Sequence, residues 1–563
     1  MLTSSGRWLR ARWADLAAGM AIWVTVALIT QRWAGLDTPD SSFYASLGIY
    51  GSEVSDRAYD NSYFWTRLGE ILPTHLLTSL LGTWPGLALW RWILLAVLIA
   101  GAYVAIRRFA SLPTAAFLTA AISLSTVPLS YLANPYLTGA VLAGTSALIA
   151  AALFDSRRAA ALAGLVMGWL VMVNPPGVLL AGVIWLTIRI HRRAVRITDL
   201  ALTAAVTVVA FLVLLALGRW QFPELDWFAS YLDAQQIRLS DFASKDPIWI
   251  KDISLLVPFA ILAFAAVIWW SRRTSMPAQL GFAISACSVA FMLVFSPLMG
   301  GIALEAPMYQ AMLWPPALIA LGLTSASLVQ PAPSASQASW SWSAVALGVL
   351  VLIAIYLSGR WPGSIGLHKG QLLAVLMLSV AIAVALLLPR GRGVHATVIA
   401  AGVMLIGAQL LQNSRPSLGL YYLSPYNWAY NDNPIADKIH AAVDAQDWLL
   451  ATTSRNDTIL TWVDGDWVNG DRDLYVAAGM QLWGPNRIGL FSELDADDHA
   501  RLESIQPSVI AMYGRSMEGV STFMHGIPAR AHASAPSCNV FSWPTGEPSV
   551  LQLCTTRLTW TLT

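Results

Sequence analysis

The sequence has few charged residues and lacks several common site motifs. Only 12% of its 563 residues are Asp, Glu, Lys or Arg, and its mean hydropathy is +0.58. Soluble domains carry about 25% charged residues, so this composition excludes an ordinary soluble protein and indicates a polytopic membrane protein. No GxxxxGK loop and no zinc-type spacing of Cys or His occurs, which argues against a P-loop nucleotide site and a structural zinc site.

Long apolar runs are the main feature instead. A helix needs roughly 20 apolar residues to cross a bilayer, and eleven segments fit: 16–34, 86–106, 114–132, 138–154, 198–218, 252–270, 278–296, 308–326, 341–358, 370–388 and 395–411. Residues 159–193 are too long for one helix and contain NPPG at 174–177. Proline cannot donate a backbone hydrogen bond, so this region predicts two short helices meeting at a break. The total expected is about thirteen transmembrane segments.

Basic residues cluster near alternate span ends, as the positive-inside rule requires for one cytoplasmic face. The clusters lie at residues 7–12, 107–108, 157–158, 189–196, 272–273 and 390–392. With thirteen crossings all of them fall in the cytoplasm, together with the N-terminus. The first segment has no small-residue cleavage site, so it is expected to be a retained span. The outer face then receives a first loop at 35–85, a second large loop at 219–251, and the C-terminal region.

The sequence divides into a transmembrane domain, 1–412, and a C-terminal domain, 413–563. From Asn413 onward there are 16 acidic and 9 basic residues, against 16 and 25 before it. Residues 433–446 and 495–505 resemble helices, whereas 447–453, 457–463 and 507–513 resemble strands, which predicts a small extracytoplasmic α/β domain. Its two cysteines, Cys538 and Cys554, suit a disulfide in an oxidising compartment, and the alternative is two reduced core thiols.

The first loop begins with LDTPDSSFYASLG, residues 36–48, in which Asp37 and Asp40 directly follow the first span. This motif, the long loop after it, the break at NPPG, the second outward loop and the outward C-terminal domain together resemble the GT-C superfamily. These integral membrane glycosyltransferases use polyprenyl-phosphate-linked donors. They include protein O-mannosyltransferases, lipid A aminoarabinose transferases, oligosaccharyltransferase catalytic subunits and actinobacterial arabinofuranosyltransferases. The topological resemblance covers about the first 410 residues.

The resemblance implies a catalytic role for an aspartate of this loop. Many members carry an Asp-Glu pair there, with a tyrosine four residues after the Asp. Asp40 precedes Tyr44 by four residues, but Ser41 replaces the second acid, so Asp37 is the second candidate. A carboxylate that takes the acceptor's proton is worth roughly 10²- to 10⁴-fold in rate. The alternative is that both aspartates cap a helix of the loop.

A lipid-phosphate leaving group needs cationic neighbours, and the outward candidates are Arg67, Lys251 and Arg57. These side chains can instead bind lipid headgroups or local acids such as Glu70. The expected substrate contacts are Tyr44, Glu305, Tyr309 and His75, although Glu305 also suits a helix N-terminus. No metal ligand is assigned; some relatives use a divalent cation such as Mg²⁺ or Mn²⁺, and no dense carboxylate cluster demands one here.

The leading hypothesis is a plasma-membrane glycosyltransferase that moves a sugar from a polyprenyl phosphate to a cell-envelope glycan, lipid or protein. Its partners would be this donor, the acceptor and membrane lipids, and no nucleic acid. One alternative is a transporter or flippase of lipid-linked glycans, although no internal repeat is visible and charges within spans are nearly absent. The other is a noncatalytic protein whose C-terminal domain binds an envelope glycan.

Overall fold

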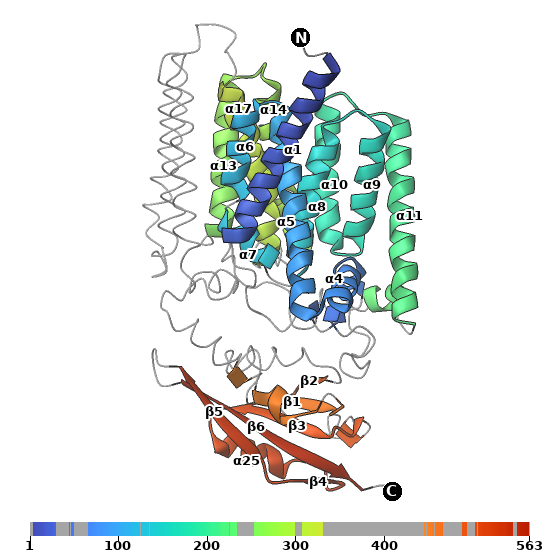
Figure 1. The fold of residues 1–563 in the computed structure, drawn as a ribbon, viewed down its shortest axis with the longest axis vertical. Helices are drawn as coiled ribbons and strands as arrows, with labels where there is room; N and C mark the ends of the chain where they lie inside the picture. The colour runs from blue at the N-terminus through green and yellow to red at the C-terminus, as the bar shows by residue number, and fades with distance from the viewer. Residues whose placement is uncertain are drawn as a thin grey trace.

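The structure is a computed structural model that combines a helical bundle with a C-terminal sheet (Figure 1). It describes residues 4–29, 44–45, 47–49, 66–123, 125–133, 136–223, 226–232, 253–298, 307–329, 444–445, 448–454, 456–464, 487–491, 502–503, 505–543 and 549–561. The sheet lies beyond one end of the bundle, and the N-terminus lies at the other end.

The bundle is built from helices of the first 329 residues. They are α1 (Ser4–Ile29), α4 (Leu68–Leu81), α5 (Thr83–Arg107), α6 (Leu112–Ser123), α7 (Thr126–Ala133), α8 (Leu137–Ala152), α9 (Arg157–Val171), α10 (Pro175–His191), α11 (Ile197–Gln221), α13 (Ile253–Ser271), α14 (Met276–Leu298), α16 (Pro307–Gln310), the 3₁₀ turn η4 (Ala311–Leu313) and α17 (Trp314–Val329). Residues 44–45, 47–49 and 227–232 are also helical.

Four described helices are long and apolar enough to cross a membrane: Pro85–Arg107, Ile197–Gln221, Met276–Ser296 and Ala311–Leu328. Shorter apolar helices occupy Trp13–Leu28, Leu137–Ala152, Pro175–His191 and Ile261–Ser271. Among the described residues helices cover most of each expected span up to 308–326. The expected span 114–132 is divided between α6 and α7, and 308–326 is divided among α16, η4 and α17. The last three expected spans, from residue 341 to 411, lie outside the described residues, so the total of thirteen stays a prediction.

The NPPG break joins two helices, as the sequence predicted. Helix α9 ends at Val171 and α10 begins at Pro175. The two prolines occupy the first positions of α10, where a missing N–H costs nothing. The side chain of Asn174 caps this helix by accepting a hydrogen bond from the Gly177 N–H at 3.3 Å.

The basic clusters of the described residues meet at the end of the bundle away from the sheet (Figure 1). There the buried Arg189 pairs with Asp155 at 2.9 Å and with Asp199 at 2.7 Å. Arg192 also pairs with Asp155, at 3.0 Å, and Arg107 pairs with Asp15 on α1 at 2.7 Å. These contacts link the connection between α8 and α9 to α10 and α11, and they link α1 to α5.

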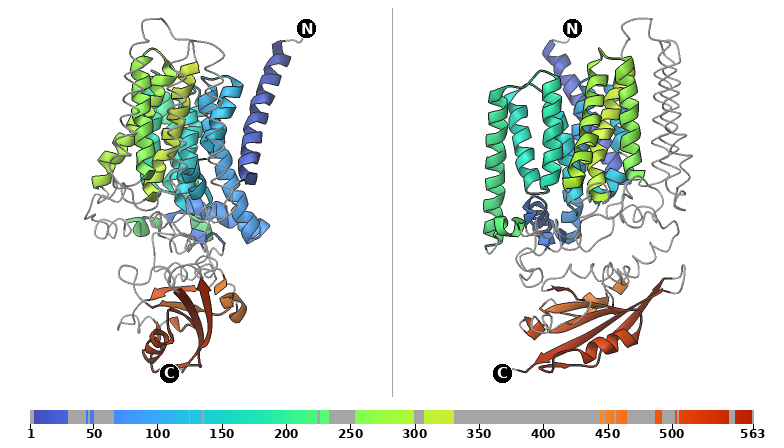
Figure 2. Two further views of the ribbon diagram at one scale, coloured as in Figure 1. Left: turned by 90° about the vertical axis from the view of Figure 1, so that its left-hand side faces the viewer. Right: turned by 180° about the vertical axis from the view of Figure 1, so that it is seen from behind.

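Helices α9 and α11 pack closely along a small-residue seam at the edge of the bundle (Figure 2). Gly164 and Gly168 are four residues apart on α9, the GxxxG spacing that lets membrane helices approach closely. A Cβ at Gly164 would lie 2.5 Å from the Thr203 carbonyl oxygen. The hydroxyls of Thr203 and Thr207 donate to the carbonyls of Ala160 and Gly164 across the same seam.

The C-terminal sheet mixes parallel and antiparallel strands. Its strands are β1 (Ile459–Val463), β2 (Arg487–Phe491), β3 (Val509–Gly514), β4 (Ala531–Ala533), β5 (Ser537–Trp543) and β6 (Ser549–Trp560), with helix α25 (Met517–His525). The order is β2-β1-β3-β6-β4, and β5 also pairs with β6. Strands β1, β2 and β3 are parallel, whereas β6 is antiparallel to its partners.

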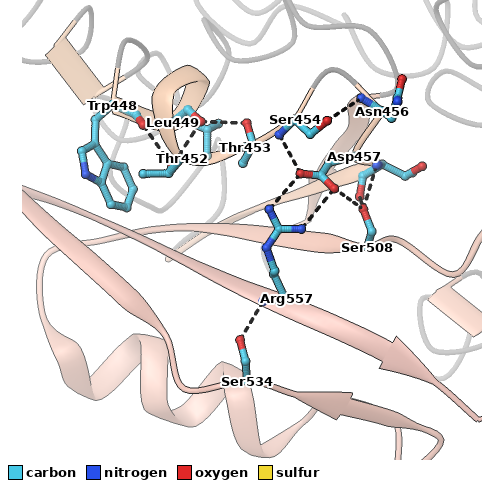
Figure 3. A network of polar contacts seen from close by, with 11 residues as sticks. Trp448, Leu449, Thr452, Thr453, Ser454, Asn456, Asp457, Ser508, Ser534 and Arg557 are labelled. Carbon is cyan, nitrogen blue, oxygen red and sulfur yellow. Dashed lines mark hydrogen bonds and ion pairs between the residues drawn. The ribbon is translucent and has the colours of Figure 1, made fainter.

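A disulfide and a polar network join strands that are distant in the sequence of this domain. Cys538 on β5 and Cys554 on β6 are directly opposite each other and form a disulfide, the predicted pair. At the start of β1, Asp457 accepts from Arg557 on β6 through both oxygens at 3.3 Å, and from the Ser454 N–H at 2.7 Å (Figure 3). Ser508, just before β3, joins this network.

One expected strand is wrong. Residues 448–452, within the predicted strand 447–453, are helical, and the Thr452 hydroxyl donates to the Trp448 carbonyl four residues earlier. A short apolar run does not distinguish a buried strand from a buried helix by periodicity. Leu449 is 1% exposed while Leu450 is 49% exposed. The predicted strands 457–463 and 507–513 are confirmed by β1 and β3.

The α9–α11 seam predicts a selective effect of one added methyl group. Gly164→Ala places its Cβ against backbone of α11 and should lower the melting temperature of the detergent-solubilised protein, at a cost of about 1–3 kcal/mol. Gly19→Ala is the matched control, because no atom lies within 4 Å of its added Cβ. Alanine is also the better helix former, so the control should melt no lower than the wild type. Equal melting temperatures for the two variants would contradict the close packing.

Candidate functional site

Helix α4 places the described part of the first loop at the sheet-facing end of the bundle (Figure 1). Its buried face includes Leu68, Glu70, Ile71, Thr74 and Thr78. Leu76 and Leu80 are 58% and 70% exposed. The expected site residue Arg67 is the N-cap of this helix, and His75 lies within it.

Two hydrogen bonds of the Gly69 backbone attach α4 to the end of α9, next to the NPPG break. Pro73 lacks an N–H, so the Gly69 carbonyl, four residues earlier, has no helical donor. The Trp169 indole donates to this carbonyl at 2.8 Å, and the Gly69 N–H donates to the Met172 carbonyl at 2.9 Å. A Cβ at Gly69 would lie 2.9 Å from the Trp169 carbonyl oxygen. Glycine and proline here therefore couple the first loop to the end of α9.

Glu70 is a buried acid next to this attachment. It is 4% exposed, and its Oε1 accepts from the Trp90 indole at 3.0 Å. Within the described part of the chain Oε2 has no hydrogen-bond partner. Burial raises the pKa of Glu70 to about 8, opposed by the Trp90 hydrogen bond and by the charge of Arg91. The carboxyl group is therefore mostly protonated at neutral pH and can donate through Oε2.

Two arginines are buried near this acid. Arg67 is 1% exposed and directly precedes α4, while Arg91 is 6% exposed and lies one residue beyond Trp90 on α5. Burying a guanidinium is costly unless charged or polar groups surround it. Arginine is also the side chain best suited to a phosphate, because its fork of N–H groups can bind two oxygens. The end of the bundle therefore concentrates positive charge where an anionic headgroup could be held.

His75 connects three parts of the structure. Its Nδ1 lies 3.2 Å from the Gly48 carbonyl, and its Nε2 lies 3.0 Å from Nε2 of Gln221 at the end of α11. A carbonyl oxygen can only accept, so Nδ1 donates to Gly48, and Nε2 accepts from the side-chain amide of Gln221. The Gly48 carbonyl also accepts from the Thr78 hydroxyl at 3.1 Å. In this structure His75 ties the first loop to α11, and its role toward a substrate stays a prediction.

The expected tyrosines are both buried in the bundle core. Tyr44 is 2% exposed and packs edge-to-face on Tyr136, with ring centroids 5.6 Å apart. Tyr309, in α16, is 7% exposed. Tyr136 directly precedes α8, so Tyr44 brings the start of the first loop against the start of that helix.

The other expected site residues lie outside the described residues: Asp37, Asp40, Arg57, Lys251 and Glu305. Arg67, Tyr44 and His75 are described, and all three belong to the first loop at the sheet-facing end. Their catalytic and binding roles stay predictions. Among the described residues, no group of three or more His, Cys, Asp or Glu side chains could hold a metal ion.

The candidate site also includes Arg91, Trp90 and Trp169, which the sequence did not predict. Arg91 stands in the expected span 86–106 between two tryptophans, in LALWRWILL. An ionisable residue inside a membrane segment is costly and commonly functional, and this signal could have identified it. Nothing in the sequence indicates that Trp169 bonds to Gly69, because that contact depends on the packing of α9 against α4.

The raised pKa of Glu70 predicts a specific pH dependence of stability. Between about pH 4.5, the ordinary value for a free glutamate, and about pH 8 the folded protein keeps a proton that the unfolded chain releases. The free energy of unfolding should therefore fall as the pH rises through this window. Glu70→Gln stays neutral and can still accept from Trp90, so its melting temperature should fall less than that of the wild type between about pH 6 and about pH 8.5. Parallel melting curves for the two proteins would show that Glu70 is ionised throughout.

Comparison with known proteins places this arrangement in a known fold. No protein-family model and no curated protein matches the sequence. ArnT from Cupriavidus metallidurans, crystallised with undecaprenyl phosphate, matches with a TM-score of 0.55 and 15% identity over 98% of both chains. Its apo structure matches with a TM-score of 0.52 and 14% identity over the same shares.

Two further structures are matched at lower scores. The Archaeoglobus fulgidus oligosaccharyltransferase gives a TM-score of 0.42 and 11% identity, over 88% of this chain and 68% of that one. The mycobacterial arabinofuranosyltransferase AftD gives 0.42 and 14%, over 96% of this chain and 41% of that one. The likeness to ArnT covers nearly the whole of both chains, so the chain shares the fold of that protein.

Proposed function

We propose that this chain is a membrane glycosyltransferase that moves a sugar from a polyprenyl-phosphate-linked donor to a cell-envelope glycan, lipid or protein. The observation that carries this proposal is the fold, shared over 98% of both chains with a protein crystallised with undecaprenyl phosphate. The buried Arg67 and Arg91 support it, since they concentrate positive charge at the sheet-facing end of the bundle.

In the proposed reaction the acceptor hydroxyl attacks the anomeric carbon of the donor sugar. Asp40 takes the hydroxyl proton as the new C–O bond forms, and Asp37 is the second candidate for this role. The bond between the sugar and the phosphate oxygen breaks, and its electron pair stays on the lipid phosphate. Arg67 and Arg91 stabilise that charge, with Lys251 and Arg57 as further candidates.

The same proposal assigns the sheet-facing end to the outer surface of the plasma membrane. The opposite end carries the basic loops with Arg107, Arg189, Arg192 and Arg272, which the positive-inside rule assigns to the cytoplasm. A multi-pass chain with a cytoplasmic N-terminus then exposes the C-terminal domain outside, where the disulfide of Cys538 and Cys554 is stable.

Transfer in membranes tests the proposed chemistry. With radiolabelled polyprenyl-phosphate sugars as donors, Asp40→Asn should reduce transfer by roughly 10²- to 10⁴-fold, because an amide cannot take the acceptor's proton. Asp37→Asn is the matched control and should lose less. Full transfer by Asp40→Asn would refute its role as the base. Absence of transfer by the wild type from every such donor, with lipid translocated instead, would favour a flippase.

Labelling of single cysteines tests the proposed orientation. In a Cys287→Ser background, Glu518→Cys on α25 should react with a membrane-impermeant maleimide in intact cells. Arg158→Cys, at an exposed position in the first turn of α9, should react only after the cells are permeabilised. Both positions are exposed, so accessibility differs only by side of the membrane. The reverse labelling pattern would invert the topology.

A further inference from the structure

Residues 44–45 and 47–49, here called the first-loop segment, lie between two hydrophobic cores. Tyr44 and Leu47 are buried in the core of the helical bundle. Ala45 is buried in a different core, that of the C-terminal sheet, and Ile49 packs against this second core. The segment therefore turns successive side chains toward the bundle and toward the C-terminal domain.

The C-terminal domain contributes most residues of the core in which Ala45 is buried. Its core contains Ala445 and Leu449 from the helical residues before β1, together with Ile459, Val463, Val509, Ala511, Tyr513, Leu551 and Leu553. Trp448 packs against the same core, and its ring lies edge-on to Phe541 on β5. Leu87, near the start of α5, joins from the bundle side and is 2% exposed.

Hydrogen bonds also attach the first-loop segment to helix α4. The Gly48 carbonyl accepts from Thr78 and faces Nδ1 of His75, both on α4. A Cβ at Gly48 would overlap the side chain of Thr74. Helix α4 is itself attached to α9 through Gly69 and so belongs to the bundle. The side of the segment that carries Ala45 and Ile49 is held by apolar contacts with a separate domain.

We propose that the C-terminal domain is a positioning device for the first loop: its core, which includes Leu449 and against which Trp448 packs, holds the first-loop segment against the bundle and so constrains the loop that carries the proposed catalytic carboxylate. The part concerning catalysis rests on the proposed function above. Asp40 precedes Tyr44 by four residues, at most about 14 Å of extended chain. A misplacement of about 1 Å in a reacting group can cost about 10²-fold in rate. Contacts that fix Tyr44 and Ala45 therefore fix the chain that immediately follows this aspartate in the sequence.

Hydrogen exchange in the full-length protein tests the contact. Leu449→Asp puts a charge into the shared core and should raise the exchange rate of the peptide covering 44–49 by about tenfold or more. Leu450→Asp is the matched control, since Leu450 is the next residue of the same helix and is 49% exposed. This control should exchange as the wild type does. Leu449→Met, which restores an apolar side chain, should restore protection.

A variant in the first-loop segment distinguishes loss of the contact from misfolding of the C-terminal domain. Ile49→Asp leaves that domain's own residues unchanged and should raise exchange at 44–49 in the same way. In each variant the Cys538–Cys554 disulfide, measured by maleimide labelling with and without reduction, reports whether the domain has folded.

Transfer assays on the same variants test positioning. Leu449→Asp and Ile49→Asp should each lower kcat by about tenfold or more. KM for the donor should stay near the wild-type value, because neither substitution changes Arg67 or Arg91. Unchanged exchange, or raised exchange with wild-type kcat, would overturn the proposal. If the wild type transfers no sugar, the proposed function fails, while the exchange result still decides whether the C-terminal domain holds the segment.

Discussion

The hydrogen bonds of Gly69 are the constraint on which the candidate site depends. Pro73 frees the Gly69 carbonyl, the Trp169 indole binds it, and the Gly69 N–H binds the Met172 carbonyl at the NPPG break. One turn of helix is thereby attached to a helix end about a hundred residues later in the chain. This attachment determines the positions of the N-cap Arg67 and of Glu70 at the end of the bundle.

The electrostatics at this end follow from burial. Arg67 and Arg91 are almost fully enclosed, and burial pushes Glu70, whose charge interacts with that of Arg91, toward its neutral form. A neutral Glu70 cancels little of the positive charge of these two arginines. At the other end of the bundle, Arg189 pairs with Asp155 and Asp199 at ion-pair distance.

Much of the fold could be predicted from the sequence because its signals are local. The apolar runs up to 308–326 and the prolines of NPPG act locally, and the described residues agree with them. The two cysteines, 16 residues apart, form the predicted disulfide. The strand expected at 447–453 failed because its apolar run carries no decisive periodicity, and the helix is selected by burial of Leu449 in a core that long-range packing creates.

The site was less predictable because its contacts cross the sequence. Arg67 and His75 could be named from the first loop, but Arg91 lay inside an apolar run, and the Trp169 contact joins residues a hundred positions apart. The division of Tyr44 and Ala45 between two cores exists only once the C-terminal domain has folded beside the bundle.

A structure of the full-length protein with undecaprenyl phosphate tests the proposed donor site most directly. We expect the phosphate group within hydrogen-bond distance of Arg67 or Arg91, at the sheet-facing end of the bundle and beside the first loop. A phosphate bound at the opposite end, among Arg107, Arg189 and Arg192, or no bound lipid phosphate at saturating concentration, would contradict it.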